Sequence, residues 1–423
     1  MNSLTVRILL GLVAGLTFGA LSPGLHLTWQ GELVSTAEAL GGVWLDALRM
    51  TIIPLVFSLL VVGVAQAAGT LRGGGLPGWA LLMFGVMLLV STTISAFATP
   101  ALLQIWPVPL EAAQALRASA HGGSAAIPPS PPMVEWLKSF VPANPVKAAA
   151  DGAMAGIVVF ALVFGLAVTR LNAHRRATMF SFFDAVQAAM MVLVEWVLWA
   201  APAGVFLLAL VVGAKTGFGA VGVLGQYVVV VSIMCLIAGG LGLLMALVGG
   251  RTPPGKLFAA LIPVEAMAIS TQSSLASLPV MLEAAERLGI PTRVRGLILP
   301  MAVALFRITS PAGNLAVVIY VAHIYGVHLD PARLAIGVVV ASLVSLAAVG
   351  VASSITFFTT LVPISMAMGV PMELLPLLLA VETLPDFSRT VGNVTGDVGI
   401  TAWAARREKP SDAMEAEAEA EAV

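Results

Sequence analysis

Long apolar segments recur along this chain, and they constrain its fold more than any other feature. They cover residues 5–22, 42–68, 77–104, 149–170, 177–212, 222–250, 295–327 and 372–405. A helix needs roughly 20 apolar residues to cross a bilayer, so each segment is long enough to do so. Only 10% of the residues are charged, compared with about 25% in soluble domains. We therefore predict an all-α polytopic membrane protein with eight transmembrane helices.

Two further apolar stretches, residues 254–291 and 330–371, are each interrupted halfway by a polar run. The interrupting runs are STQSSLAS at 270–277 and ASSITFFTT at 352–360. Non-helical backbone at membrane depth is tolerated only where protein encloses it or where it lines a cavity. We therefore predict that each stretch forms a re-entrant helical hairpin whose polar tip lies inside the membrane.

The basic residues predict how the chain is oriented in the bilayer. With a cytoplasmic N-terminus, most of the 21 Lys and Arg residues fall on the cytoplasmic side, as the positive-inside rule requires. No signal-peptide cleavage site closes the first apolar run, so we expect it to remain as the first helix. We predict an inner (cytoplasmic) membrane protein with both termini in the cytoplasm, an extracellular loop at 105–139 and a disordered acidic tail at 409–423.

The last apolar segment carries the most informative polar side chains of the chain. Residues 382–397 include these ionisable and polar groups: Glu382, Asp386, Arg389, Thr390, Asn393 and Asp397. On a helix, the groups from 386 to 397 project from one face. Each ionisable group at bilayer depth costs about 2.5–3.5 kcal/mol on insertion scales. These side chains must therefore be buried in protein or line an aqueous cavity, and they form the best candidate for a binding site.

Several motifs carry a resemblance to a known family. They are LRMTIIPLVFSLLVVGVA at 48–65, NPVKAAADG at 144–152, SSLASLPVMLEAAERLGI at 273–290 and DFSRTVGNVTGD at 386–397. With them, about residues 5–408 resemble the glutamate/aspartate transporter family of dicarboxylate/amino acid:cation symporters, as a divergent bacterial-type member. The resemblance implies a homotrimer in which a fixed scaffold carries mobile transport domains across the bilayer like elevators.

The resemblance also implies how the chain divides. It assigns residues 1–75 and 140–218 to the scaffold and trimerisation domain. Residues 76–104 and 219–408, with both hairpins, would form the transport domain. Partners of such a protein are the lipid bilayer and a small acidic substrate, and no basic cluster suggests nucleic acid.

The chemistry of the last segment fits an acidic amino acid. A guanidinium matches a carboxylate bidentately, so Arg389 in a desolvated pocket would favour a substrate with a side-chain carboxylate. Asp386 can accept from a substrate ammonium, while Thr390 and Asn393 supply neutral hydrogen bonds. A competing interpretation is that Asp386 and Arg389 merely neutralise each other. By resemblance, the serines of the hairpin tips add to the substrate site: Ser273, Ser274, Ser353 and Ser354.

Cation coupling is where the chain departs from the family. The family's sodium-binding motif N-M-D-G-T aligns with residues 306–310, so its carboxylate is replaced by Ile308, next to Arg307. The third apolar segment has Ser91, Ile94 and Ser95 where a tyrosine, a threonine and a serine are usual. The second hairpin tip lacks the usual glycines over Ala352–Phe357. The remaining candidates for coupling are Asp397 (a possible Na⁺ ligand), Asn393, Thr309, Ser310, Arg307 and Glu382.

These departures suggest that Arg307 partly occupies the space of a bound sodium ion and pairs with Asp397. Transport would then be proton-coupled or independent of cations. An equally open alternative is that Arg307 contacts a lipid headgroup or backbone carbonyls. For a proton carrier, Glu382 is the natural candidate because burial favours the protonated form of a carboxylate; it could equally be a partner for Arg307 or a hairpin serine.

We therefore predict a secondary active symporter of glutamate or aspartate, with Na⁺ or H⁺ as the coupling ion and no other cofactor. A C4-dicarboxylate carrier or a cation-independent exchanger is the nearest alternative. An anion channel is a more remote alternative, which stays open because polar hairpins also build filters. A non-transporting sensor is another remote alternative. No enzyme is predicted, because no metal-binding or nucleophile motif occurs. The single cysteine, Cys235, excludes an internal disulfide.

Overall fold

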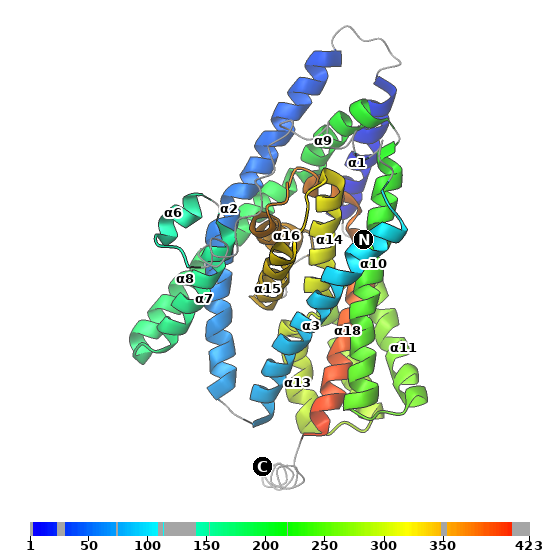
Figure 1. Ribbon diagram of the computed structural model, residues 1–423. Helices are drawn as coiled ribbons and strands as arrows, with labels where there is room; N and C mark the ends of the chain where they lie inside the picture. The colour runs from blue at the N-terminus through cyan, green and yellow to red at the C-terminus, as the bar shows by residue number, and fades with distance from the viewer. Residues whose placement is uncertain are drawn as a thin grey trace.

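The computed structural model describes residues 3–22, 30–72, 75–108, 113, 141–151, 153–217, 219–347 and 353–407. Within these residues every regular element is a helix, so the predicted all-α class is confirmed (Figure 1). The helices are α1 (Ser3–Leu21), α2 (Gln30–Arg72), α3 (Gly75–Ile105), α6 (Pro145–Ala150), α7 (Met154–Thr169), α8 (Ala173–Trp199), α9 (Ala201–Thr216), α10 (Gly219–Leu244), α11 (Pro254–Thr271), α12 (Ser274–Arg287), α13 (Thr292–Leu305), α14 (Thr309–Tyr325), α15 (Pro331–Ala347), α16 (Ser353–Met368), α17 (Leu375–Val381) and α18 (Thr383–Ala405). A short π-helix, Met245–Gly249, extends α10.

The helices are long and apolar, as a membrane protein requires. Within the described residues, 5 helical stretches are long and apolar enough to cross a bilayer: Gln30–Val64, Gly75–Ile105, Ala173–Trp199, Val221–Gly249 and Thr292–Tyr325. Shorter apolar helices include Val6–Leu21, which lies in the segment predicted to remain as the first helix. The chain is therefore a polytopic membrane protein by length and composition of its helices.

Two predicted spans are not single regular helices. The span expected at 177–212 is divided at Ala200, where α8 ends and α9 begins, so that prediction was wrong. Pro202 lies in the first turn of α9, where its missing N–H costs nothing. The span expected at 295–327 is broken between Leu305 and Thr309, at the residues that align with the family's unwound motif.

Both predicted hairpins are pairs of packed helices. In the first, α11 and α12 pack together and are separated only by Gln272 and Ser273, so the chain reverses within the predicted polar run. Gln272 adopts a left-handed conformation with φ of 51°, which allows the tight reversal. In the second, α15 packs against α16. The turn between them falls in residues 348–352, outside the described residues, and α16 begins at Ser353, within the predicted polar run.

The packing places α18 at the centre of one part of the molecule. It lies against α10, α13, α11, α12 and α14, while α1 packs along α9 and α2 packs against α7 and α8 (Figure 1). Glycines allow α10 and α18 to meet backbone to backbone, because a Cβ on Gly242 would lie 2.7 Å from Gly396 Cα. Small residues let membrane helices approach this closely. The polar face of α18 is therefore enclosed by protein rather than lipid.

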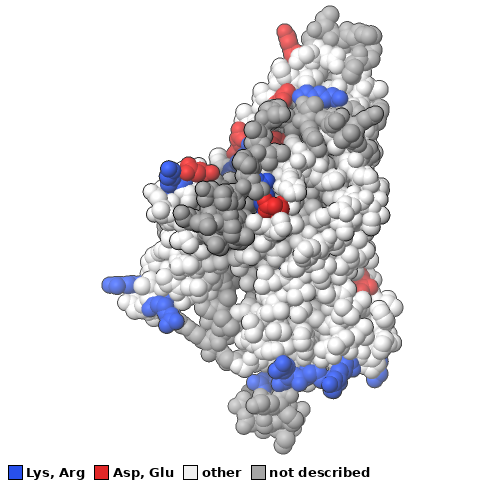
Figure 2. Space-filling model, in the orientation of Figure 1, with Lys and Arg blue, Asp and Glu red and all other residues white. Residues whose placement is uncertain are grey.

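Basic side chains gather at one end of the molecule. Figure 2 shows Lys and Arg along the lower edge, the end at which α13 begins and α18 ends in Figure 1. The basic residues near those helix ends include Arg293, Arg295, Arg406 and Arg407. This end is the one that the sequence analysis assigned to the cytoplasm.

Candidate functional site

The polar residues of the last segment lie on α18 and are buried. Asp386, Arg389 and Asn393 are 7%, 6% and 2% exposed, and Thr390 is also buried. Glu382 is the residue between α17 and α18 and is 4% exposed. The structure therefore brings the predicted substrate-binding residues of this segment into the protein interior, as their cost in lipid required.

Arg389 is surrounded by protein acceptors. Its Nη2 lies 2.6 Å from Glu382 Oε1, and its Nε lies 3.7 Å from Asp386 Oδ1. Its Nη1 donates to Asn314 Oδ1 at 2.9 Å. The pairing of Asp386 with Arg389, one of the two interpretations left open, thus occurs, but Glu382 is the closer partner. A buried guanidinium needs this degree of compensation, because an unpaired buried charge is very costly.

Glu382 is held from two sides. One carboxylate oxygen accepts from Arg389, and the other accepts a very short hydrogen bond from the hydroxyl of Tyr227 on α10. Tyr227 is fully buried, and its ring packs against Tyr320 with centroids 5.7 Å apart. The open alternative that Glu382 is a partner for Arg307 or a hairpin serine gains no support from these contacts.

A small cavity lies beside these groups. Its volume is about 20 Å³, and it is lined by Arg307, Ser310, Asn314, Phe357, Thr360, Glu382, Asp386 and Arg389. This space has room for about one water molecule, so it is too small for an amino acid in this conformation. The lining residues come from the α13–α14 break, α14, α16 and α18. Two guanidinium and two carboxylate groups face one another there.

Asn393 and Thr390 are engaged within the protein. Asn393 Oδ1 accepts from the backbone N–H of Thr309 at 3.0 Å and from its hydroxyl at 2.8 Å. Asn393 thereby caps the first residue of α14, a role the sequence did not predict. Thr390 donates to the backbone carbonyl of Asp386 at 2.9 Å. Neither side chain lines the cavity.

Arg307 and Asp397 each retain a buried atom without a hydrogen-bond partner, Nη1 and Oδ1 respectively. The two side chains lie within electrostatic range of each other, and Asp386 and Arg389 also act on Arg307. Asp397 is 1% exposed on α18, one turn beyond Asn393. The pairing of Arg307 with Asp397 stays a prediction, since no ion pair or hydrogen bond joins the two side chains in the described part of the structure.

Two hydroxyl groups of α3 donate hydrogen bonds to backbone carbonyls at and just after the α13–α14 break. Ser91 donates to the carbonyl of Ile308 at 3.0 Å, and Ser95 donates to the carbonyl of Ala312 at 2.7 Å. These are the serines that stand where the family builds part of a sodium site. These two contacts tie α3 to the backbone on either side of Thr309, at the start of α14.

The hairpin serines lie differently from the α18 residues. Ser273 caps α12 by accepting from the backbone N–H of Ala276 at 3.2 Å. Ser273 and Ser274 are partly buried and do not line the cavity. The side chains of Ser353 and Ser354 lie outside the described part of the structure.

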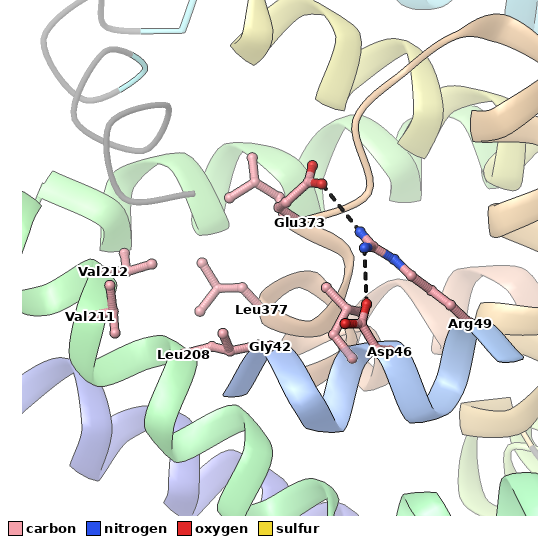
Figure 3. Close-up of a pocket in the computed structure, with 10 residues that line it drawn as sticks. Gly42, Asp46, Arg49, Leu208, Val211, Val212, Glu373 and Leu377 are labelled. Atoms are coloured by element: carbon pink, nitrogen blue, oxygen red, sulfur yellow. Dashed lines mark hydrogen bonds and ion pairs between the residues drawn. The ribbon is translucent and has the colours of Figure 1, made fainter. Parts of the chain in front are cut away.

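A second cavity, of about 170 Å³, lies between α2, α9 and the start of α17 (Figure 3). Its floor is apolar and includes Leu208 and Leu377. At its edge Arg49 reaches Asp46 at 3.2 Å and Glu373 at 3.1 Å, as the dashed lines show. This cavity is larger than the one at Arg389. The charged residues that line it, Asp46, Arg49 and Glu373, form ion pairs with one another.

Sequence reasoning missed two residues of the site. Asn314 follows Ser310 by one helical turn on α14, and this i, i+4 spacing could have placed it on the same face. Tyr227 is one of only 3 tyrosines in the chain, but nothing in its apolar surroundings indicates which helix it faces. Phe357, expected at a hairpin tip, instead lines the cavity from α16.

Comparisons with known proteins identify the family of the chain. The chain matches the Sodium:dicarboxylate symporter family over residues 4–407. It is 29% identical to the Neutral amino acid transporter A of Homo sapiens, over 94% of this chain and 80% of that protein. It is 26% identical to the Proton/glutamate-aspartate symporter of Escherichia coli (strain K12) and 27% identical to the Proton/sodium-glutamate symport protein of Bacillus subtilis (strain 168), over 93% of this chain and 90% of each relative. The chain therefore belongs to the sodium:dicarboxylate symporter family, as its motifs predicted.

Proposed function

We propose that this protein is a symporter that carries an acidic amino acid, glutamate or aspartate, across the membrane. The observation that carries the proposal is the buried Arg389 at the edge of a small cavity, with Asp386 beside it. Arg389 would bind the side-chain carboxylate of the substrate, and Asp386 would accept from its ammonium group. Thr390, Asn393 and the hairpin serines would complete the site once it opens.

The coupling ion in this proposal is a proton rather than sodium. The residue at the motif's carboxylate position is Ile308, which offers no side-chain oxygen, and neighbouring carbonyls accept hydrogen bonds from Ser91 and Ser95. A hard cation needs several oxygen ligands, and the fixed charge of Arg307 opposes a second cation nearby. Asp397 and Glu382, both buried carboxylates, are the candidate proton carriers. The name of the Escherichia coli relative includes only the proton and supports this choice, whereas the name of the Bacillus subtilis relative includes both proton and sodium.

The proposed architecture follows the family. A homotrimer would hold a scaffold of residues 1–75 and 140–218, and residues 76–104 and 219–408 would move as the transport domain. The cluster of basic side chains at one end of the molecule (Figure 2), where α18 ends, supports an orientation with that end in the cytoplasm. We propose that the N-terminus lies in the cytoplasm as well. The membrane would be the inner (cytoplasmic) membrane.

A neutral amino acid is the second candidate substrate. The observation that favours it is the pairing of Arg389 with Glu382 at 2.6 Å, which leaves the guanidinium already neutralised. A zwitterionic substrate would then require no further charge compensation in the cavity. The similarity to the Neutral amino acid transporter A of Homo sapiens also favours a neutral substrate.

Uptake into proteoliposomes would separate these possibilities. Labelled aspartate, glutamate, asparagine, alanine and succinate would be tested, with proton and sodium gradients imposed separately. We expect aspartate or glutamate uptake driven by the proton gradient alone, and trans-stimulation by unlabelled substrate, which a channel does not show. Arg389→Gln should abolish the preference for aspartate over asparagine, whereas Arg287→Gln, a change at an exposed arginine of α12, should retain it. Strict sodium dependence, or equal uptake of asparagine by the unmodified protein, would contradict the proposal.

A further inference from the structure

A basic surface lies at the end of the molecule where α13 begins and α18 ends (Figure 2). Five exposed side chains near these helix ends and near the start of α11 form it, and we call them the basic rim: Arg251, Lys256, Arg293, Arg406 and Arg407. The rim belongs to segments that lie far apart in the sequence, so only the fold brings these charges together.

Contacts at the end of α18 hold part of the rim in place. The Nε of Arg406 donates to the carbonyl of Gly250 at 3.0 Å, directly before Arg251. The guanidinium carbon of Arg407 lies 5.7 Å from the ring centroid of Trp79 on α3. Both guanidinium groups are thus fixed at the surface by a carbonyl and by an aromatic ring, and neither contact neutralises their charge.

The acidic side chains next to the rim are paired with other residues. Glu283 lies 3.6 Å from Arg287, and Glu286 lies 3.3 Å from Arg295. Within the residues that the structure describes, the four rim side chains other than Arg293 form no ion pair with a carboxylate. Like charges gathered on one surface repel one another, so an anionic partner would stabilise the rim.

The chain that follows the rim carries a matching negative charge. The acidic tail, residues 409–423, has five acidic side chains and one lysine, and Glu408 precedes it. Together these residues have a net charge of −5, against +5 for the basic rim. Acidic blocks of this kind are often interaction segments. The tail therefore fits the rim in both the sign and the amount of charge.

The acidic tail also starts on the rim itself. Helix α18 ends at Ala405, and the rim residues Arg406 and Arg407 follow it. An extended chain spans at most about 3.3–3.6 Å per residue, so the eight residues from Arg407 to Glu415 reach roughly 26–29 Å. Attachment at the rim gives the tail a high effective concentration there. Several exposed ion pairs that are weak singly can therefore hold it.

We propose that the acidic tail binds the basic rim, where its carboxylates pair with Arg251, Lys256 and Arg293 and tie the start of α11 to the end of α18. The proposal is independent of which substrate and which ion the protein carries. It requires no regular structure in the tail, because the attraction between exposed charges depends on distance rather than on a fixed geometry. Anionic lipid headgroups are the competing occupant, and the matching charge and covalent attachment favour the tail.

A fluorescent label on the tail would report the contact. The single cysteine of the chain, Cys235, is completely buried, so Ala418→Cys in the full chain provides an accessible position for a thiol-reactive label. The anisotropy of the label would be measured on the purified protein in a neutral detergent at low salt. The reference for an unbound tail is the same labelled chain with these four tail residues replaced by glutamine: Glu415, Glu417, Glu419 and Glu421.

The rim would be tested with Arg251→Gln and Lys256→Gln combined, two changes at exposed positions. The matched control is Arg170→Gln with Arg175→Gln, which removes two positive charges from exposed positions at the turn between α7 and α8. We expect high anisotropy in the unmodified rim and in the control, and a fall to the value of the unbound tail in the rim variant. About 1 M salt should have the same effect, because it shortens the Debye length to about 3 Å.

Unchanged anisotropy in the rim variant would overturn the proposal. Binding of the rim to lipid headgroups instead of the tail gives the same result, since the label then rotates freely in neutral detergent whether or not the rim is intact. Nanodiscs of phosphatidylglycerol and of phosphatidylcholine would separate the two occupants. We expect the anionic lipid to compete with the tail and lower the anisotropy, whereas the neutral lipid should leave it high.

A second measurement needs no change in the rim. A carbodiimide joins a lysine amine to a carboxylate that contacts it, and Lys256 is the one lysine of the basic rim. We expect mass spectrometry to find Lys256 joined to tail glutamates, and Lys147, on α6, not joined to them. Lys256→Arg keeps the charge and should abolish this product. Coupling of the tail glutamates to Lys409 alone, within the tail, would contradict the proposal.

Discussion

The guanidinium of Arg389 lies 2.6 Å from the carboxylate of Glu382, seven residues earlier in the chain. Both groups are almost completely buried, and Tyr227 holds the other oxygen of the carboxylate. The carboxylate of Glu382 thus pairs with the guanidinium of Arg389, which we expect to bind a substrate carboxylate. The two carboxylates would compete for one guanidinium, which makes Glu382 the first residue to test.

Glu382→Gln should increase the preference for aspartate over asparagine. The amide keeps the shape of the side chain but removes the charge that competes for Arg389, and charge-assisted pairs are about twice as strong as neutral ones. We expect the ratio of the two affinities to rise several-fold in isothermal titration. Glu195→Gln, a change at an exposed glutamate of α8, is the matched control. An unchanged or lower ratio would show that Glu382 does not compete with the substrate.

Asp397→Asn should uncouple transport from the proton gradient. Asp397 is 1% exposed and one of its oxygens has no hydrogen-bond partner, so the ionised form is poorly compensated. The asparagine cannot take up and release a proton. We expect substrate binding and counterflow to persist while a proton gradient no longer drives accumulation. Asp184→Asn, at an exposed position of α8, should retain accumulation, and gradient-driven uptake in Asp397→Asn would contradict the assignment.

Gly242→Ala should destabilise the protein through the contact of α10 with α18. The added Cβ would lie 2.7 Å from the backbone of Gly396, so one of the helices must shift. Overpacking of this kind costs about 1–3 kcal/mol, and we expect a lower midpoint of thermal unfolding in detergent. Gly240→Ala is a close control, because no atom lies within 4 Å of its Cβ position. Equal stability of the two variants would argue against the tight packing.

The ion pair of Arg49 with Glu373 should affect transport rate more than stability (Figure 3). The side chains are 34% and 25% exposed, and such a pair contributes only about 0–1 kcal/mol. It joins α2, which we assign to the scaffold, to the segment before α17, which we assign to the transport domain. If the two move past each other, the pair must break.

Arg49→Gln and Glu373→Gln should therefore each raise the rate of counterflow, with unchanged substrate affinity. The double variant should show no further increase, because either substitution removes the same contact. Counterflow rates from all three variants, measured at saturating substrate, would check this. Additive changes would mean that the two residues act separately.

Some features of the site followed from local patterns alone. The spacing of Asp386, Arg389 and Asn393 placed them on one helical face, and the cost of charges in lipid required that this face be covered. The structure agrees, because helical period and desolvation act on every residue of a segment regardless of its neighbours. The polar interruption at Gln272 and Ser273 likewise marked the first hairpin tip.

Local patterns failed where the outcome depends on contacts between elements. The division of one expected span at Ala200 was missed. A proline such as Pro202 is compatible with a helix start as well as a kink, so periodicity cannot decide between them.

By itself the sequence determined an all-helical membrane protein with buried charges on its last segment, because apolar length and helical period are properties of single segments. Only the tertiary structure decided that Arg389 pairs with Glu382, that Tyr227 holds this carboxylate, and that donors from Arg307 and Asn314 face the same cavity. These groups come from separate helices, and their distances depend on how α10, α14 and α18 pack. Packing is decided by complementarity over the whole molecule, which no local pattern of residues contains.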